Sequence, residues 1–222
     1  MILKEYPDRE FMMVSLADRI ASELRQALAQ GPATLSVPGG TTPGPVFDIL
    51  SDLDLDWANV SVLLNDERWV GEDSPRSNTR LLRERLLRKR AASARLVPLH
   101  APVPSPEEAL EALSAQVEAA LPISVLLLGM GADMHTASLF PGADRLEEAL
   151  APEAPALMAL RAEAAGEPRI TLTARVLRDA MHCHVLITGE EKRAALERAE
   201  TLTDAEAPIR IVLKNATIHW AP

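Results

Sequence analysis

The sequence predicts an α/β fold, with helices packed around a mainly parallel β-sheet, in a single domain that spans residues 1–222. Short apolar runs alternate with segments of helical periodicity along the whole chain. The run Ile123–Leu128 is apolar at nearly every position, which is typical of a strand buried on both faces of a parallel sheet. No composition break, charge block or Ser/Gly linker divides the chain, so we expect one domain.

In the first half, apolar residues recur at helical spacing from Phe11 to Leu28, and Gly31 and Pro32 end that helix. Ser77 is expected near the N-cap of a later amphipathic helix, whose basic end lies at residues 88–90. The elements expected after the first helix are, in order, a strand at 34–37, a helix from about 43, a strand at 60–64, a helix around 81–86, a short strand at 96–99 and a helix at 106–120.

In the second half, the strand at Ile123–Leu128 ends in a glycine-rich segment, and several short elements follow. The expected elements are a helix at 145–150, a strand at 156–160, a helix at 174–178 that residues 168–172 precede, a strand at 182–187, a helix from 189 to about 200, and strands at 209–213 and 217–220.

Composition and charge exclude several classes of function. Hydrophobic residues make up 47% and charged residues 25%, as in ordinary globular proteins. The net charge of -9 argues against a nucleic acid or an anionic membrane as partner. The first twenty residues lack the apolar core of a signal peptide, and no apolar run is long enough to cross a membrane. The single cysteine, Cys183, fits a reducing compartment, so a cytoplasmic location is expected.

The segment Pro38–Gly44 links an expected strand to an expected helix and contains the pair Gly39-Gly40. Backbone N–H groups of such a turn can converge on a phosphate, although a plain strand-to-helix turn has the same residues. No Gly-Lys-Ser/Thr follows, which argues against a Walker loop. Gly129 and Gly131 lack the third glycine of a dinucleotide-binding motif, because Met134 stands there.

Asp133 and His135 follow the carboxyl end of the strand at Ile123–Leu128, where ligands bind in open α/β sheets. A carboxylate beside an imidazole can fix its tautomer and make it a general base, while a helix-capping aspartate and a partly buried histidine would have the same spacing. Three charged residues, Asp66–Arg68, likewise follow the strand at 60–64. These are either part of a site at the sheet edge or, more commonly, a surface turn.

Other reactive residues have weaker patterns. His182 and His184 alternate along one strand and therefore share a face, but no carboxylate or cysteine is spaced to complete a metal motif. We therefore interpret them as packing residues. No G-x-S-x-G elbow occurs, and Cys183 lies among apolar neighbours, so a covalent intermediate is not expected.

Five motifs, in order along the chain, resemble those of the 6-phosphogluconolactonases of the pentose phosphate pathway. The longest is G-M-G-A-D-M-H-T-A-S-L-F-P at 129–141, which resembles the family's G-x-G-x-D-G-H-x-A-S-L-F-P. The others are residues 39–43, similar to G-G-S-T-P; 66–70 followed by 77–78, similar to D-E-R-x-V and S-N; 169–171, similar to R-I-T/S; and 189–192, similar to G-x-x-K. The resemblance extends from the first expected strand to about residue 200.

The resemblance implies a Rossmann-like three-layer sandwich, with helices on both faces of a mainly parallel sheet, a fold shared with glucosamine-6-phosphate deaminases and ribose-5-phosphate isomerases. It implies hydrolysis of 6-phospho-D-glucono-1,5-lactone to 6-phosphogluconate without a cofactor or metal. His135, oriented by Asp133, is expected to activate water, and Arg68 to stabilise the carbonyl oxygen. The residues expected to bind the phosphate are Gly39, Gly40, Thr41, Thr42, Arg169 and Lys192.

The two cations Arg169 and Lys192 reconcile an acidic protein with an anionic sugar-phosphate lactone. The motifs leave open which of Arg68, Arg76 and Arg169 reaches the carbonyl end of the substrate. We expect a monomer or a weak homodimer.

Two residues depart from the family pattern. Met134 stands where the family usually has glycine, and a positive φ there would strain a methionine. Pro38 stands where the glycine loop usually begins with serine, which removes a hydroxyl and a backbone donor. Activity is still expected.

Two alternatives use the same fold. Deaminases carry a D-G-H-I-A-F-N-E-P-like string with a catalytic glutamate and usually a tyrosine in place of Arg68. This chain has Ser138–Pro141 in that region, with no carboxylate before Asp144, which favours the lactonase over a deaminase or sugar-phosphate isomerase. The other alternative is a non-catalytic sugar-phosphate sensor, although no basic helix-turn-helix precedes the domain.

Overall fold

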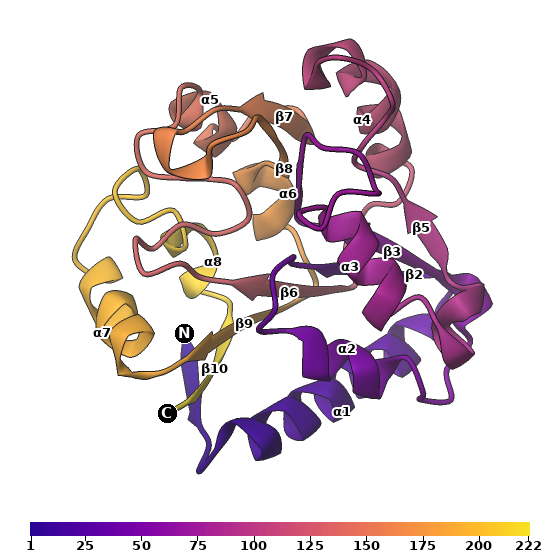
Figure 1. Ribbon diagram of the computed structural model, residues 1–222. Coiled ribbons are helices and arrows are strands. Elements are labelled where there is room, and N and C mark those ends of the chain that lie inside the picture. Colours follow the sequence, from indigo (N-terminus) through magenta and orange to yellow (C-terminus); the bar gives the residue numbers. More distant parts are fainter.

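The computed structural model describes residues 1–222, and a seven-stranded sheet runs through its centre (Figure 1). All neighbouring strands in this sheet are parallel. In spatial order they are β1 (Ile2–Glu5), β10 (Thr217–Ala221), β9 (His182–Thr188), β6 (Val125–Gly129), β2 (Ala33–Val37), β3 (Val60–Leu64) and β5 (Arg95–Val97). The mainly parallel sheet predicted from the sequence is confirmed.

Helices cover both faces of the sheet. Helices α1 and α2 lie on one face, and α4, α6 and α8 lie on the other (Figure 1). The α-helices are α1 (Arg9–Leu28), α2 (Gly44–Leu50), α3 (Asn78–Arg85), α4 (Leu110–Glu118), α5 (Leu146–Leu150), α6 (Ala174–Arg178), α7 (Glu190–Ala199) and α8 (Arg210–Leu213). Short 3-10 helices occur at Trp57–Asn59, Lys89–Ser93, Pro106–Glu108 and Glu163–Ala165. None of these helices has the length and apolar character needed to cross a membrane.

Local sequence accounts for the longest helix, α1. Asp8 is its N-cap, and the Asp8 side chain accepts a hydrogen bond from the backbone N–H of Phe11 at 2.7 Å. Its buried apolar positions, such as Leu16, Ile20 and Leu24, are spaced for one helical face, which packs on the sheet. These side chains belong to one core cluster of 64 buried residues, which contains side chains from both faces of the sheet.

A second sheet, antiparallel and three-stranded, was not expected. It is formed by β4 (Asp66–Arg68), β8 (Arg169–Leu172) and β7 (Leu157–Leu160). Only Asn65 separates β3 from β4, so the chain passes from the central to the small sheet at the carboxyl edge of β3. There Asn65 accepts a hydrogen bond from the Ser36 hydroxyl at 2.7 Å and donates one to the carbonyl of Leu127 at 2.8 Å. This buried side chain therefore joins β2, β3 and β6 where the site begins.

Three expectations from the sequence are wrong. Residues 209–213 contain helix α8 rather than a strand. The commoner interpretation of Asp66–Arg68 as a surface turn fails, because these residues form β4 and Glu67 is fully buried. The basic run 88–90 does not end a helix, since α3 stops at Arg85; its side chains instead pair with aspartates, Arg88 with Asp48, Lys89 with Asp52 and Arg90 with Asp54. Strand β1 was not anticipated.

Buried hydrogen bonds connect α1 to β9, β10 and the segment after β1. Tyr6 Oη lies 2.8 Å from His219 Nδ1, His219 Nε2 lies 3.1 Å from His184 Nδ1, and His184 Nε2 lies 2.7 Å from Glu23 Oε2. Arg19 Nε donates to the other oxygen of Glu23 at 2.6 Å. We call these five residues the histidine relay. His184 is buried, as expected for a packing residue, but hydrogen bonds to Glu23 and His219 hold it. The His182 side chain is 38% exposed, and its Nδ1 lies 3.6 Å from Glu23 Oε1.

Candidate active site

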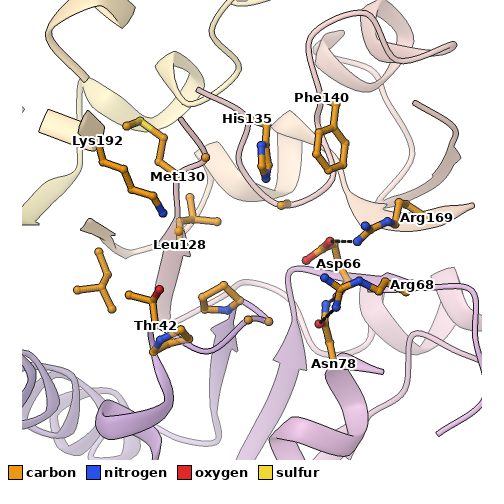
Figure 2. A pocket seen from close by; sticks show the side chains of 18 of the residues that line it. Thr42, Asp66, Arg68, Asn78, Leu128, Met130, His135, Phe140, Arg169 and Lys192 are labelled. Atoms are coloured by element: carbon orange, nitrogen blue, oxygen red, sulfur yellow. Dashed lines mark hydrogen bonds and ion pairs between the residues drawn. The ribbon is translucent and has the colours of Figure 1, made fainter. Parts of the chain in front are cut away.

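A cavity of about 340 Å³ lies where the central parallel strands end. Open α/β sheets bind ligands at this edge. Figure 2 shows Lys192 and Thr42 on one side of the cavity and Arg68, Asn78 and Arg169 on the other. The residues that line it are Pro38, Gly39, Gly40, Thr42, Pro43, Asp66, Arg68, Asn78, Leu128, Gly129, Met130, Gly131, His135, Ala137, Phe140, Ala164, Arg169, Leu186 and Lys192.

The glycine loop between β2 and α2 forms one wall of the cavity. A side chain at Gly39 would overlap the carboxamide of Asn78, so the loop backbone comes closer to Asn78 than any other residue would permit. Gly40 has a φ of 82°, in the left-handed region. Thr42 lines the cavity, whereas Thr41 is exposed and does not.

His135 and Asp133 form a direct pair at the cavity edge. His135 Nδ1 lies 2.5 Å from Asp133 Oδ1, and the backbone N–H of His135 donates to the same oxygen at 3.3 Å. The hydrogen bond from His135 lowers the pKa of Asp133. An ionised Asp133 accepts a hydrogen bond from Nδ1–H, which leaves the unprotonated Nε2 of a neutral His135 free to accept a proton. His135 lines the cavity, and Asp133 lies behind it.

The loop that carries this pair is closed by its own backbone. Gly131 N donates to the His135 carbonyl and Met134 N donates to the Gly131 carbonyl, both at 3.0 Å. Met134 has a φ of 66°, so the left-handed conformation considered from the sequence is present. Its carbonyl accepts from Ile209 N at 3.1 Å, which fastens the loop to the residue before α8. Hydrogen bonds at the N–H and the carbonyl of Met134 therefore hold its strained backbone conformation.

Phe140 joins His135 to the arginine side of the cavity. Its ring centroid lies 4.2 Å from that of His135, and the Arg169 guanidinium carbon lies 5.7 Å from the Phe140 centroid. Phe140 belongs to the long motif at 129–141, but its type alone gave no reason to assign it a role. The Phe140 ring therefore packs against the imidazole, and Asp133 holds its Nδ1.

Arginines and carboxylates gather on the side of the cavity opposite Lys192. Arg169 NH1 lies 3.7 Å from Asp66 Oδ2, and Arg76 NH2 lies 2.5 Å from Glu167 Oε2. Burial lowers the pKa of Arg169. The negative charge of Asp66 raises this pKa, and the positive charge of Arg68 lowers it further. We call Arg68, Arg76, Arg169, Asp66 and Glu167 the arginine cluster.

Asn78 and Glu67 hold Arg68 in place. Arg68 NH1 donates to Asn78 Oδ1 at 3.0 Å and to the carbonyl of Arg76 at 2.8 Å. Glu67 Oε1 accepts from the backbone N–H groups of Arg68 and Asn78, both at 2.8 Å. From the sequence Asn78 was expected only as part of the 77–78 motif, with no role of its own, because its contact with Arg68 joins residues ten positions apart.

Most of the residues predicted from the sequence lie around this one cavity. Thr41 is outside it, and Asp133 reaches it through His135. Arg169 and Lys192, expected at the same phosphate, lie on opposite sides in Figure 2. No group of three or more His, Cys, Asp or Glu side chains is placed to hold a metal ion.

Comparisons with known proteins give a consistent relationship. Residues 7–220 match the family model described as glucosamine-6-phosphate isomerases/6-phosphogluconolactonase. The chain is 44% identical to a 6-phosphogluconolactonase of Rhizobium meliloti, with 94% of this chain and 93% of the relative covered. It is 42% identical to a 6-phosphogluconolactonase of Pseudomonas aeruginosa, with 93% and 89% covered.

Solved structures agree. A crystal structure of a 6-phosphogluconolactonase from Shewanella baltica has a TM-score of 0.95 and 34% identity, covering 100% of this chain and 98% of that one. A monomeric glucosamine-6-phosphate deaminase, with a TM-score of 0.83, 16% identity and coverage of 100% and 97%, shares the fold. The chain belongs to the glucosamine-6-phosphate isomerase/6-phosphogluconolactonase family.

Proposed function

We propose that this chain hydrolyses 6-phospho-D-glucono-1,5-lactone to 6-phosphogluconate, as a hydrolase of the oxidative pentose phosphate pathway. The observation that carries the proposal is the His135–Asp133 pair at the edge of a cavity with cationic side chains on both sides. The identity to 6-phosphogluconolactonases over nearly the whole chain supports the same reaction.

In the proposed mechanism, His135 Nε2 accepts a proton as water attacks the lactone carbonyl carbon. Asp133 holds Nδ1 and stabilises the imidazolium that forms. Arg68 stabilises the negative charge that develops on the carbonyl oxygen. The bond from carbonyl carbon to ring oxygen then breaks, and the imidazolium returns its proton to the ring oxygen, giving a hydroxyl and a carboxylic acid that ionises in water.

The substrate-binding part of the proposal uses both sides of the cavity. The residues proposed to bind the phosphate are Gly39, Gly40, Thr41, Thr42, Arg169 and Lys192. Lys192 and the glycine loop lie together at one side, and this supports their acting on the same anionic group (Figure 2). Arg169 lies with Arg68 and Arg76, which supports a second contact with an oxyanion there.

The remaining parts of the proposal concern the whole protein. We treat residues 1–222 as one domain, supported by one core cluster that draws on both faces of the sheet. A cytoplasmic location and a monomer or weak homodimer, with no nucleic-acid or membrane partner, complete the proposal; the net charge of -9 supports the exclusion of nucleic acid.

The decisive experiment measures loss of the lactone by the purified protein without added metal, corrected for spontaneous hydrolysis. We expect His135→Ala to lower the rate by roughly 10²–10⁴-fold, because proton transfer by a positioned base contributes that much. His100→Ala is the control, since His100 contacts Trp69 and does not line the cavity.

An unchanged rate in His135→Ala would remove His135 from the mechanism. Ammonia release from glucosamine 6-phosphate would indicate a deaminase instead. Stabilisation by 6-phosphogluconate without turnover of the lactone would indicate a sensor.

A further inference from the structure

Three buried polar atoms in the arginine cluster have no hydrogen-bond partner. They are Arg68 Nε, Arg169 Nε and Glu167 Oε1. Arg68 Nε lies 3.4 Å and Arg169 Nη2 lies 3.9 Å from Glu167 Oε1, so this carboxylate oxygen is close to both guanidinium groups but accepts a hydrogen bond from neither. Buried polar atoms are nearly always hydrogen-bonded, so Arg68 and Arg169, which both line the cavity, each keep an unused donor.

Glu167 is the carboxylate of the cluster that no strand or helix holds. It lies in the loop between the 3-10 helix Glu163–Ala165 and β8, and its firm contact is with Arg76, whose side chain is 59% exposed. Asp66, in contrast, is fixed in β4 and accepts a hydrogen bond from the buried Ser138 hydroxyl. The cluster thus contains one fixed carboxylate and one on a loop.

We propose that Glu167 is an internal anion that occupies the arginine cluster in the free protein and competes there with an oxyanion of the ligand. This inference rests on the proposed function, because it concerns how that site selects its anionic substrate. Glu167 does not itself touch the reacting atoms and acts through its contacts with Arg68 and Arg169. It sets affinity and specificity, since an anion must replace it to gain the unused donors of Arg68 and Arg169.

Charge balance explains the direction of the effect. The cluster has three guanidinium groups and two carboxylates, so its net charge is one positive. A dianion that entered while Glu167 stayed would make the net charge negative. If Glu167 withdraws, the net charge of the remaining groups is two positive, and the dianion neutralises it. An anion that binds too weakly to displace Glu167 is therefore excluded from the cluster. A ligand that makes further contacts in the rest of the cavity can displace Glu167.

The test measures direct binding of inorganic phosphate and of gluconate by calorimetry at low ionic strength, together with kinetics on the lactone. Glu167→Gln keeps the size of the side chain and removes its charge. We expect binding of at least one of these anions to tighten by about 5- to 30-fold and KM to fall with kcat nearly unchanged. Tighter phosphate binding alone assigns the phosphate end of the substrate to the cluster, and tighter gluconate binding alone assigns the carboxylate end.

Glu163→Gln is the matched control, because Glu163 is exposed in the same segment and the substitution changes the net charge equally. If Glu167→Gln does not unfold cooperatively, Glu167→Asp, which withdraws the carboxylate by one methylene, replaces it with a smaller expected gain. Anion affinities equal to or weaker than those of the control would overturn the inference. Because binding is measured without turnover, a protein that fails to hydrolyse the lactone would refute the proposed function and leave this test intact.

Discussion

Gly131 makes room for the His135–Asp133 pair. A side chain built at Gly131 would overlap both the imidazole and the carboxylate. We expect Gly131→Ala to push the pair apart and to lower kcat/KM for the lactone by roughly 10–100-fold, because small displacements of a general base are costly. The change is measured by steady-state kinetics.

Gly129→Ala is the control two residues earlier, since no atom lies within 4 Å of a side chain built there. It also lines the cavity but displaces no protein atom, so it should lose clearly less activity than Gly131→Ala. Equal losses in the two variants would mean that the loop, rather than the pair, was disturbed.

Met134 shows how far the sequence predicts this loop. Its departure from the family's glycine pointed to a strained position, and the structure has φ of 66° there. Ala137, with φ of 50°, was not identified, because alanine matches the motif and gives no local sign of an unusual backbone. A sequence reveals backbone strain only where a residue differs from the type that the family has at that position.

At the scale of elements, Glu67 connects β4 to α3. Its fully buried carboxylate accepts from the backbone N–H groups of Asn78 and Thr79, at 2.8 and 2.7 Å, and from the Thr79 hydroxyl at 2.8 Å. Glu67→Gln would place an amide donor against N–H donors. We expect it to lower the free energy of unfolding by about 2–4 kcal/mol, measured by urea denaturation.

Glu84→Gln on the same helix is the control, because Glu84 pairs only with Arg80 at an exposed position. A surface pair of this kind contributes under about 1 kcal/mol. A similar small loss for Glu67→Gln would show that the buried carboxylate is not needed to join the two elements.

Element types were predictable where local pattern decides them. The long helix α1 and the central strands follow from apolar spacing and breakers. Residues 209–213 were misassigned because an Ile-Arg-Ile-Val-Leu run suits either a strand or a buried helical turn. Strand β4 was misjudged because its charged residues are buried by partners far along the chain, such as Ser138 for Asp66.

At the scale of the whole molecule, the histidine relay links folding to pH. Burial, the largest cause, lowers the pKa of His219 from 6.5 to about 3. The unfolded chain therefore binds a proton here below about pH 6.5, while the folded chain stays neutral. Stability from this group is fully present above that pH and is lost as the pH falls toward 3.

We expect a loss of about 2 kcal/mol in the free energy of unfolding between about pH 7.5 and about pH 5 from this group. His219→Gln should flatten that part of the profile, measured by urea denaturation at each pH. His100→Gln should keep the original slope. A profile for His219→Gln as steep as that of the unchanged protein would assign the pH dependence to other groups.

The pairing of β1 with β10 has a consequence for the order of folding during synthesis. Strand β1 contacts no other strand, and its partner spans residues 217–221. Strand β1 therefore has no place in the sheet until β10, more than 200 residues later, has been synthesised. Strands β2, β3 and β6, whose carboxyl ends lead into cavity-lining residues such as Pro38, Asp66 and Gly129, can assemble earlier. Loss of the final residues should thus release the first ones, although the two segments lie at opposite ends of the chain.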